Sequence, residues 1–139
     1  MTLELVPLGT MVAELRPPKV LPKTPAGTRM IYEVASGYIE GERLNAKLAG
    51  NAAADWLLVG PDGTGTLDVR SLVETDDGAL VLIQYRGRVD LAAGPRSPLY
   101  ATPRFETGDP RYAWLNKLQA VGKGFLVENT LTYELYELR

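Results

Sequence analysis

The segment Thr66–Leu91, TLDVRSLVETDDGALVLIQYRGRVDL, contains two strand-like halves joined by a turn sequence. The first half alternates between two sets of side chains, which is the period-two pattern of a strand with two different faces. One set is Leu67, Val69, Ser71 and Val73, and the other is Asp68, Arg70, Leu72 and Glu74. Asp76-Asp77-Gly78 is typical of a hairpin turn, so we interpret the two aspartates as turn residues rather than a catalytic or metal-binding pair.

The second half, Ala79–Leu91, is the longest predicted strand, and Gly87 within it predicts a bulge or a bend. Two other segments have loop-like compositions. Arg16–Gly27 contains four prolines and predicts an ordered loop or lid rather than a strand. Gly50–Ala54 also predicts a loop. Further strands are expected at Leu3–Leu15, Thr28–Ala35, Arg43–Leu48, Asp55–Val59 and, as one or two strands, Gly124–Leu138.

A short helical turn is predicted near residues 109–114, because Asp109 and Pro110 suit the N-cap and first position of a helix. A strand is expected to follow from about Asn116. The chain as a whole predicts seven to nine short strands, little helix and no internal repeat. The expected fold is therefore all-β: one domain over residues 1–139, built as a single antiparallel β-barrel of about eight strands.

The composition excludes several kinds of chemistry. The 139 residues include no Cys and no His, so thiolate nucleophiles, disulfides and Ser-His-Asp triads are impossible. We expect no metal and no cofactor, and catalysis would use carboxylates, Tyr, Lys or Arg. The net charge of −2 without a basic stripe predicts no nucleic-acid partner. The lack of a long apolar run or a signal peptide predicts a cytoplasmic protein with no membrane partner.

Four groups of residues form a distinctive set: Glu40-Gly41-x-Arg43-Leu44, Ala54-Asp55-Trp56, Thr75-Asp76-Asp77-Gly78-Ala79, and Phe105-Glu106-Thr107-Gly108 with Tyr112-Ala113-Trp114-Leu115-Asn116. In order and spacing this set resembles a known family, the small bacterial and fungal barrels called domain of unknown function three-two-three-seven. The resemblance extends from Leu3 to about Leu138. It implies a calycin-like or allene-oxide-cyclase-like barrel and brings no established general activity.

Asp55 and Glu106 are the candidate catalytic residues. Asp55 beside Trp56 suits a general acid or base at a barrel rim, with a pKa raised by its apolar neighbour. The pair equally suits a turn cap and a packing indole. Glu106 suits a base that faces the lumen. It equally suits an ion pair with Arg104 or Arg111, or an acceptor of backbone N–H groups in the following turn.

The candidate substrate-binding residues are Arg43, Trp56, Tyr112, Trp114 and Asn116. A tyrosine hydroxyl and an asparagine amide can orient a carbonyl or enolate oxygen. Tyr112, Trp114 and Asn116 can also form a plug at one barrel end. A lumen-facing arginine would bind a ligand carboxylate with two hydrogen bonds. Arg43 is the preferred candidate, while outward-facing positions are the usual case for strand arginines such as Arg70 and Arg86.

The leading functional hypothesis is an enzyme that binds a small, partly apolar carbonyl compound in the barrel lumen and transfers protons without a cofactor. The expected reaction is an isomerisation, cyclisation, hydration or elimination, catalysed by an isomerase, cyclase or lyase. The alternatives are a non-catalytic carrier barrel and a structural oligomerisation module. Edge strands and the proline-rich segment also make a homodimer plausible.

Overall fold

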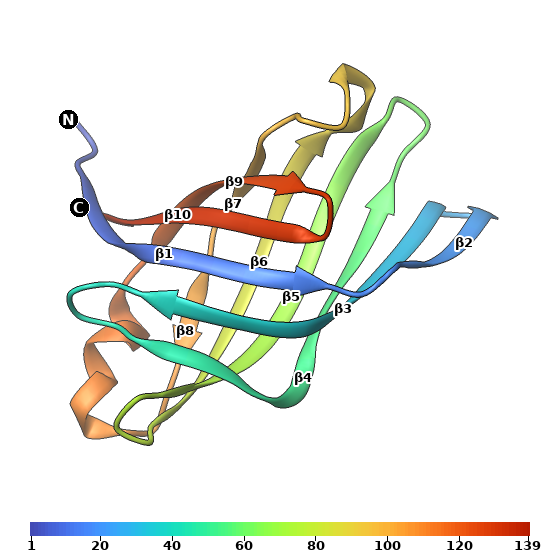
Figure 1. The fold of residues 1–139 in the computed structure, drawn as a ribbon. Helices are drawn as coiled ribbons and strands as arrows, with labels where there is room; N and C mark the ends of the chain where they lie inside the picture. The colour runs from blue at the N-terminus through green and yellow to red at the C-terminus, as the bar shows by residue number, and fades with distance from the viewer.

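The computed structural model describes residues 1–139 and contains ten strands and two short 3-10 segments (Figure 1). The strands are β1 (Leu5–Leu15), β2 (Lys19–Thr24), β3 (Gly27–Glu40), β4 (Ala46–Val59), β5 (Thr64–Thr75), β6 (Leu80–Asp90), β7 (Leu99–Ala101), β8 (Arg104–Glu106), β9 (Ala120–Val127) and β10 (Thr130–Leu138). The 3-10 segments are η1 (Leu91–Ala93) and η2 (Pro110–Lys117).

Eight of these strands form a closed antiparallel barrel. The hydrogen-bonded order is β1-β10-β9-β7-β6-β5-β4-β3, and β1 also pairs with β3, which closes the circle. Because the barrel is closed, each of these eight strands has a paired neighbour on both sides for at least part of its length. The predicted fold, an all-β barrel of about eight strands, is confirmed.

The β5–β6 hairpin has the pairing that the sequence predicts. Leu67, Val69 and Val73 are buried in the core of the barrel, and the turn ends at Gly78 with φ +92°. Of the bulge or bend expected at Gly87, the bulge is absent, because the β5–β6 register continues through this residue without a shift. A Cβ at Gly87 would collide with the carbonyl oxygen of Tyr100, so the glycine permits close approach of β7.

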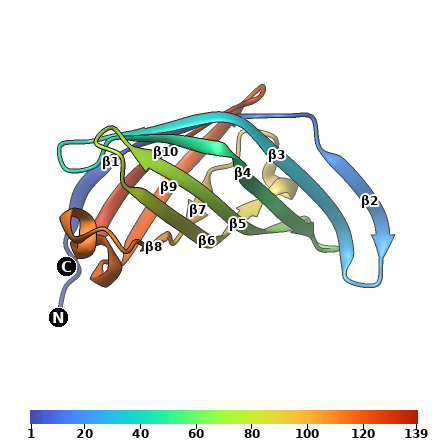
Figure 2. The same cartoon turned by 90° about the horizontal axis from the view of Figure 1, so that it is seen from below.

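The prediction that Arg16–Gly27 is only a loop is wrong, because Lys19–Thr24 forms β2. Lys19, Val20 and Leu21 pair with β3, and the register shifts before Thr24. An edge strand tolerates proline because only one of its edges needs N–H donors. The β2–β3 hairpin projects from the barrel at the end opposite to η2 and the two chain termini (Figures 1 and 2).

The predicted loop at Gly50–Ala54 is instead part of β4. The strand is irregular at this place, because Gly50 has φ +64° and the β4–β5 register shifts between Leu48 and Ala53. The β3–β4 pairing is interrupted over the neighbouring interval, between the pairs Glu33–Ala54 and Tyr38–Lys47. Two adjacent strands therefore separate at one place in the barrel wall.

The predicted helical turn near 109–114 is confirmed as η2, a 3-10 segment that extends to Lys117. The Asp109 side chain accepts a hydrogen bond from the backbone N–H of Arg111, and Pro110 follows at the first position. The next strand begins at Ala120 rather than at about Asn116. No helix has the length and apolar composition needed to cross a membrane.

Candidate functional site

A row of four side chains crosses the inner face of the barrel. Tyr32 on β3 lies opposite Asp55 on β4, Asp55 lies opposite Val69 on β5, and Val69 lies opposite Tyr85 on β6. Directly opposed residues share one face of a sheet, and Val69 and Tyr85 belong to the buried core. Asp55 is therefore a carboxyl group on the inner wall of the barrel.

Tyr133 approaches this row from β10. Its ring packs edge-to-face on Tyr85 with the centroids 5.7 Å apart. Gly124 lies opposite Tyr133, and a Cβ there would come within 2.6 Å of its ring, so the glycine makes room for the tyrosine. Tyr133 is only 1% exposed, and its hydroxyl forms no hydrogen bond of standard geometry, although the Tyr85 hydroxyl is near enough to affect its pKa. Such groups are rare in native proteins and require an explanation.

Asp55 is the perturbed carboxyl of this region. Burial raises its pKa from 3.8 to about 6, while the hydrogen bond from the backbone N–H of Asp68, 3.0 Å long, opposes the shift. The negative charge of Asp68 raises the pKa further. A carboxyl group with a pKa near 6 exchanges protons readily in the neutral pH range.

The three tyrosines around Asp55 remain protonated at neutral pH. Burial raises the pKa of each hydroxyl above its usual value, and the nearby Asp55 carboxylate adds to the shift for Tyr32, Tyr85 and Tyr133. A protonated phenol donates a hydrogen bond. The site therefore combines one exchangeable proton on Asp55 with neutral hydroxyl donors nearby.

A cavity of about 50 Å³ borders Tyr85 and Tyr133. It lies beneath the interval where β3 and β4 separate, and Gly37, Leu48 and Ala53 from this interval line it. The rest of its lining is mainly apolar, and Asp55 and Tyr32 lie outside the lining, beyond Val69 and Tyr85. The volume suffices for a few waters or a small chemical group, so a larger ligand would have to widen the opening.

The chemistry that these residues support is proton transfer. Asp55 can give or take a proton, and the tyrosine hydroxyls can donate hydrogen bonds to an oxygen that gains negative charge. No group of three or more carboxylates in the structure could hold a metal ion.

The structure separates the other candidate residues from Asp55. Trp56 points to the outer surface and is 40% exposed, so burial rather than the indole raises the pKa of Asp55. Glu106 is exposed on β8, opposite the partly buried Leu82 on β6, and it forms no ion pair. The expectation that Glu106 faces the lumen does not match this position.

Arg43, Tyr112 and Trp114 do lie together, but at the η2 end of the barrel. The Arg43 guanidinium stacks 4.7 Å above the Trp114 ring centroid and forms a 2.7 Å ion pair with Glu137. The Tyr112 hydroxyl donates a 2.8 Å hydrogen bond to Asp77. In β5, Val69 lies beside Asp55, and Thr75 lies at the η2 end, next to the turn that contains Asp77. These two residues are six positions apart, roughly 20 Å along the strand. This cluster therefore forms a separate surface pocket.

Asn116 has a structural position. Its amide accepts a 2.8 Å hydrogen bond from the backbone N–H of Thr107 and donates a 2.9 Å bond to the carbonyl of the same residue. These two bonds fasten η2 to the segment after β8. The side chain binds backbone groups and does not reach the barrel interior.

Tyr32, Tyr85 and Tyr133 were not among the predicted site residues. A partial signal was present for Tyr133, which shares one face of the last strand with Leu131 and Leu135. Strand alternation identifies such a tyrosine as inward-facing, but it does not show which carboxyl group lies across the lumen. That information requires the tertiary structure.

Comparison with known proteins gives a family and a small set of relatives. A UPF0311 protein of Rhodopseudomonas palustris strain TIE-1 is 31% identical over 109 residues, covering 69% of this chain and 71% of that protein. The hydroalkoxylation enzyme phnH of Penicillium herquei is 28% identical over 106 residues, covering 76% of this chain and 64% of that protein.

A solved structure has the same fold. The β-barrel-like protein from Acinetobacter baumannii AYE superposes with a TM-score of 0.89 at 31% sequence identity, covering 100% of this chain and 98% of that one. The family model described as "Protein of unknown function (DUF3237)" matches residues 3–138. The chain therefore belongs to the DUF3237 family of β-barrel proteins.

Proposed function

We propose that this protein is a cofactor-independent enzyme that transfers protons on a small, partly apolar carbonyl or unsaturated compound inside the barrel. The observation that carries the proposal is the buried Tyr133 hydroxyl, which forms no hydrogen bond of standard geometry within the protein. An unpaired buried hydroxyl costs stability, and a ligand oxygen beside Asp55 would satisfy it. The raised pKa of Asp55 suits the same function.

Asp55 performs the proton transfer in this proposal. Protonated Asp55 gives its proton to one carbon of a double bond, and a hydroxyl oxygen of the same molecule bonds to the neighbouring carbon. The proton released from that oxygen returns to the Asp55 carboxylate, so the cycle balances without a cofactor. Tyr85 and Tyr133 donate hydrogen bonds to the carbonyl oxygen of the substrate, the role that the sequence suggested for Arg43, Tyr112 and Asn116.

The similarity to phnH supports this class of reaction. That protein is named as a hydroalkoxylation enzyme, and hydroalkoxylation adds an O–H group across a carbon–carbon multiple bond. The addition consumes one proton at carbon and releases one at oxygen, which matches the proton balance above. Cyclisation is therefore the first reaction to test, with isomerisation, hydration and elimination beside it.

The cavity favours a compact substrate with apolar surface. Its volume is about 50 Å³, and apolar residues form most of its lining. A substrate would enter where β3 and β4 separate, next to Ala53 and Gly37. Few backbone hydrogen bonds join β3 to β4 there, so widening this interval costs less than opening a fully paired wall.

The test is a deuterium-exchange assay with small uncharged enones, lactones and hydroxy-alkenes, ranked first by thermal-shift screening. Proteins and compounds are incubated in D2O, and mass spectrometry measures deuterium at carbon. Asp55→Asn should slow incorporation by about 100-fold or more, as expected for loss of a general acid–base group. Tyr133→Phe should slow it while leaving the protein folded.

Glu106→Gln is the matched control, because it neutralises the other candidate carboxylate, which is exposed on β8. It should keep the wild-type rate within about twofold. Full turnover in Asp55→Asn would disprove the assignment of Asp55. A compound that binds without any deuterium incorporation or turnover, with equal affinity for wild type and Asp55→Asn, would favour the carrier alternative.

A further inference from the structure

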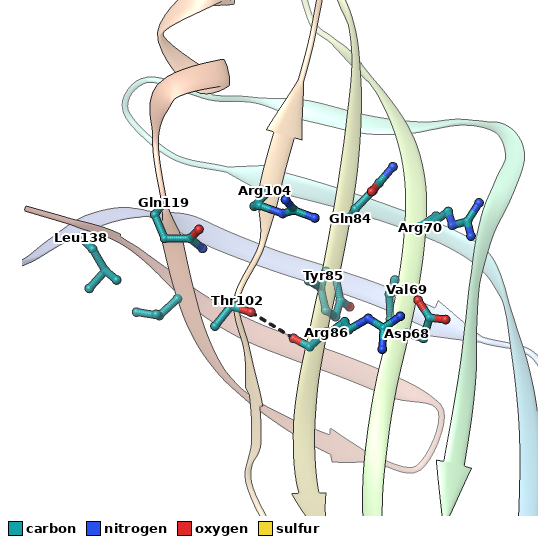
Figure 3. Close-up of a pocket in the computed structure, with 11 residues that line it drawn as sticks. Asp68, Val69, Arg70, Gln84, Tyr85, Arg86, Thr102, Arg104, Gln119 and Leu138 are labelled. Atoms are coloured by element: carbon teal, nitrogen blue, oxygen red, sulfur yellow. Dashed lines mark hydrogen bonds between the residues drawn. The ribbon is translucent and has the colours of Figure 1, made fainter. Parts of the chain in front are cut away.

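A second pocket lies on the outer face of β5, β6 and β8, and Val69 and Tyr85 of the barrel wall also contribute to its lining. Its volume is about 570 Å³, and three arginines line it: Arg70, Arg86 and Arg104. All three side chains are exposed. Figure 3 shows them with Gln84 between them. The sequence suggested that Arg70 and Arg86 face either the lumen or the solvent, and both face outward.

The strand register places the three arginines around one residue, Gln84. Gln84 on β6 lies opposite Arg70 on β5 and opposite Arg104 on β8. Arg86 is two positions further along β6 on the same face, roughly 7 Å away along the strand. Neighbouring strands are ~4.8 Å apart, so long arginine side chains from all three positions can reach a ligand above Gln84.

These three arginines form no ion pair, although the Arg86 side chain extends toward Asp68 (Figure 3). None of the four ion pairs in the structure involves Arg70, Arg86 or Arg104. The pocket contains one acidic residue, Asp68, which lies opposite Arg86 in the register. The whole chain has a net charge of −2, so the local excess of positive charge runs against its overall composition.

We propose that this pocket binds a small anion carrying at least two negatively charged oxygen groups, such as a phosphate compound or a dicarboxylate. Arginine forms paired hydrogen bonds with carboxylate and phosphate oxygens, and three guanidinium groups can bind several oxygens of one ligand. The Gln84 amide adds a donor at the centre of the triad. A bound anion also relieves repulsion among the three arginines.

The test is calorimetric titration of the full-length protein with pyrophosphate and, separately, with succinate, at low ionic strength. Saturable binding of at least one of the two anions is expected. The anion that binds more tightly shows whether the pocket prefers phosphate or carboxylate groups. Arg86→Gln should weaken it by about fivefold or more, and the double variant Arg70→Gln/Arg104→Gln by about tenfold or more. The circular dichroism spectra should match wild type, because these side chains are exposed.

Arg111→Gln is the control for loss of one positive charge, since Arg111 lies at η2 and pairs with Asp77 and Asp109. Its affinity should stay within about twofold of wild type. Equal weakening by Arg111→Gln, or no saturable binding of either anion, would overturn the proposal. Tighter, length-dependent binding of a single-stranded oligonucleotide would also overturn it. Tyr133→Phe should leave anion affinity unchanged, which keeps this test separate from that of the interior site.

Discussion

Tyr133 packs edge-to-face against Tyr85 at a centroid distance of 5.7 Å, yet the Tyr133 hydroxyl forms no hydrogen bond of standard geometry. The aromatic ring fits the barrel core and its polar end does not. The Asp55 carboxyl adds its negative charge to the surroundings of this hydroxyl and raises its pKa further. A core chosen for stability alone would favour phenylalanine at this position. In the proposed function, this hydroxyl donates its hydrogen bond to a substrate oxygen.

Tyr133→Phe should leave the stability of the protein unchanged or raise the free energy of unfolding by up to ~1 kcal/mol. The reason is that the substitution removes a buried hydroxyl that forms no hydrogen bond of standard geometry while keeping the ring. Urea denaturation monitored by fluorescence measures the difference. A loss of more than ~1 kcal/mol would mean that the hydroxyl makes a stabilising hydrogen bond in solution.

Asp55→Asn should stabilise the protein at pH 8 and have little effect at pH 4. The pKa of Asp55 is about 6 in the folded state against an ordinary value of 3.8, so the folded state binds the proton more tightly than the unfolded state. Stability contributed by the protonated carboxyl is present below pH 3.8 and declines until the pH passes 6. Asparagine does not titrate and avoids this loss.

The size of the effect follows from the pKa difference. Each unit corresponds to ~1.4 kcal/mol, so the gain of Asp55→Asn should grow by ~2–3 kcal/mol between pH 4 and pH 8. Denaturation curves of both proteins at pH 4, 6 and 8 measure it, and other titrating groups cancel in the comparison. A gain that is equal at all three pH values would contradict the raised pKa.

Gly124→Ala should destabilise the barrel by ~1–3 kcal/mol. An added Cβ would come within 2.6 Å of the Tyr133 ring, so the ring or the β9–β10 pair must shift. Gly108→Ala is the matched control, because nothing lies within 4 Å of a Cβ at Gly108. Thermal unfolding of both variants provides the measurement, and equal melting temperatures would show that the ring position adjusts freely.

Asn116→Ala should lower the free energy of unfolding by ~1 kcal/mol, because it removes two hydrogen bonds to the backbone of Thr107. Asn129→Ala, at an exposed residue of the β9–β10 turn, serves as the control and should change little. If turnover is found, Asn116→Ala should preserve its rate once folding is confirmed. If Asn116→Ala lowers the turnover rate without lowering stability, Asn116 is a substrate-binding residue.

The accuracy of the sequence-based predictions depended on the range of the interactions involved. Leu67, Val69 and Val73 were assigned to one face correctly, because strand alternation is a local property. The β2 strand was missed because proline content argues against a strand, whereas an edge position accepts it. The direction of Glu106 depended on how the three-residue strand β8 pairs with β6, which no local pattern shows.

The sequence by itself determined the barrel class, the hairpin at Asp76-Asp77-Gly78, the helical turn at Asp109-Pro110 and the absence of histidine and cysteine chemistry. These features follow from alternation, turn propensity and composition, which act over a few residues. Only the tertiary structure decided that Asp55 faces Tyr85 and Tyr133. Closing the barrel places strands that are distant in sequence around one lumen. Burial there raises the pKa of the Asp55 carboxyl group.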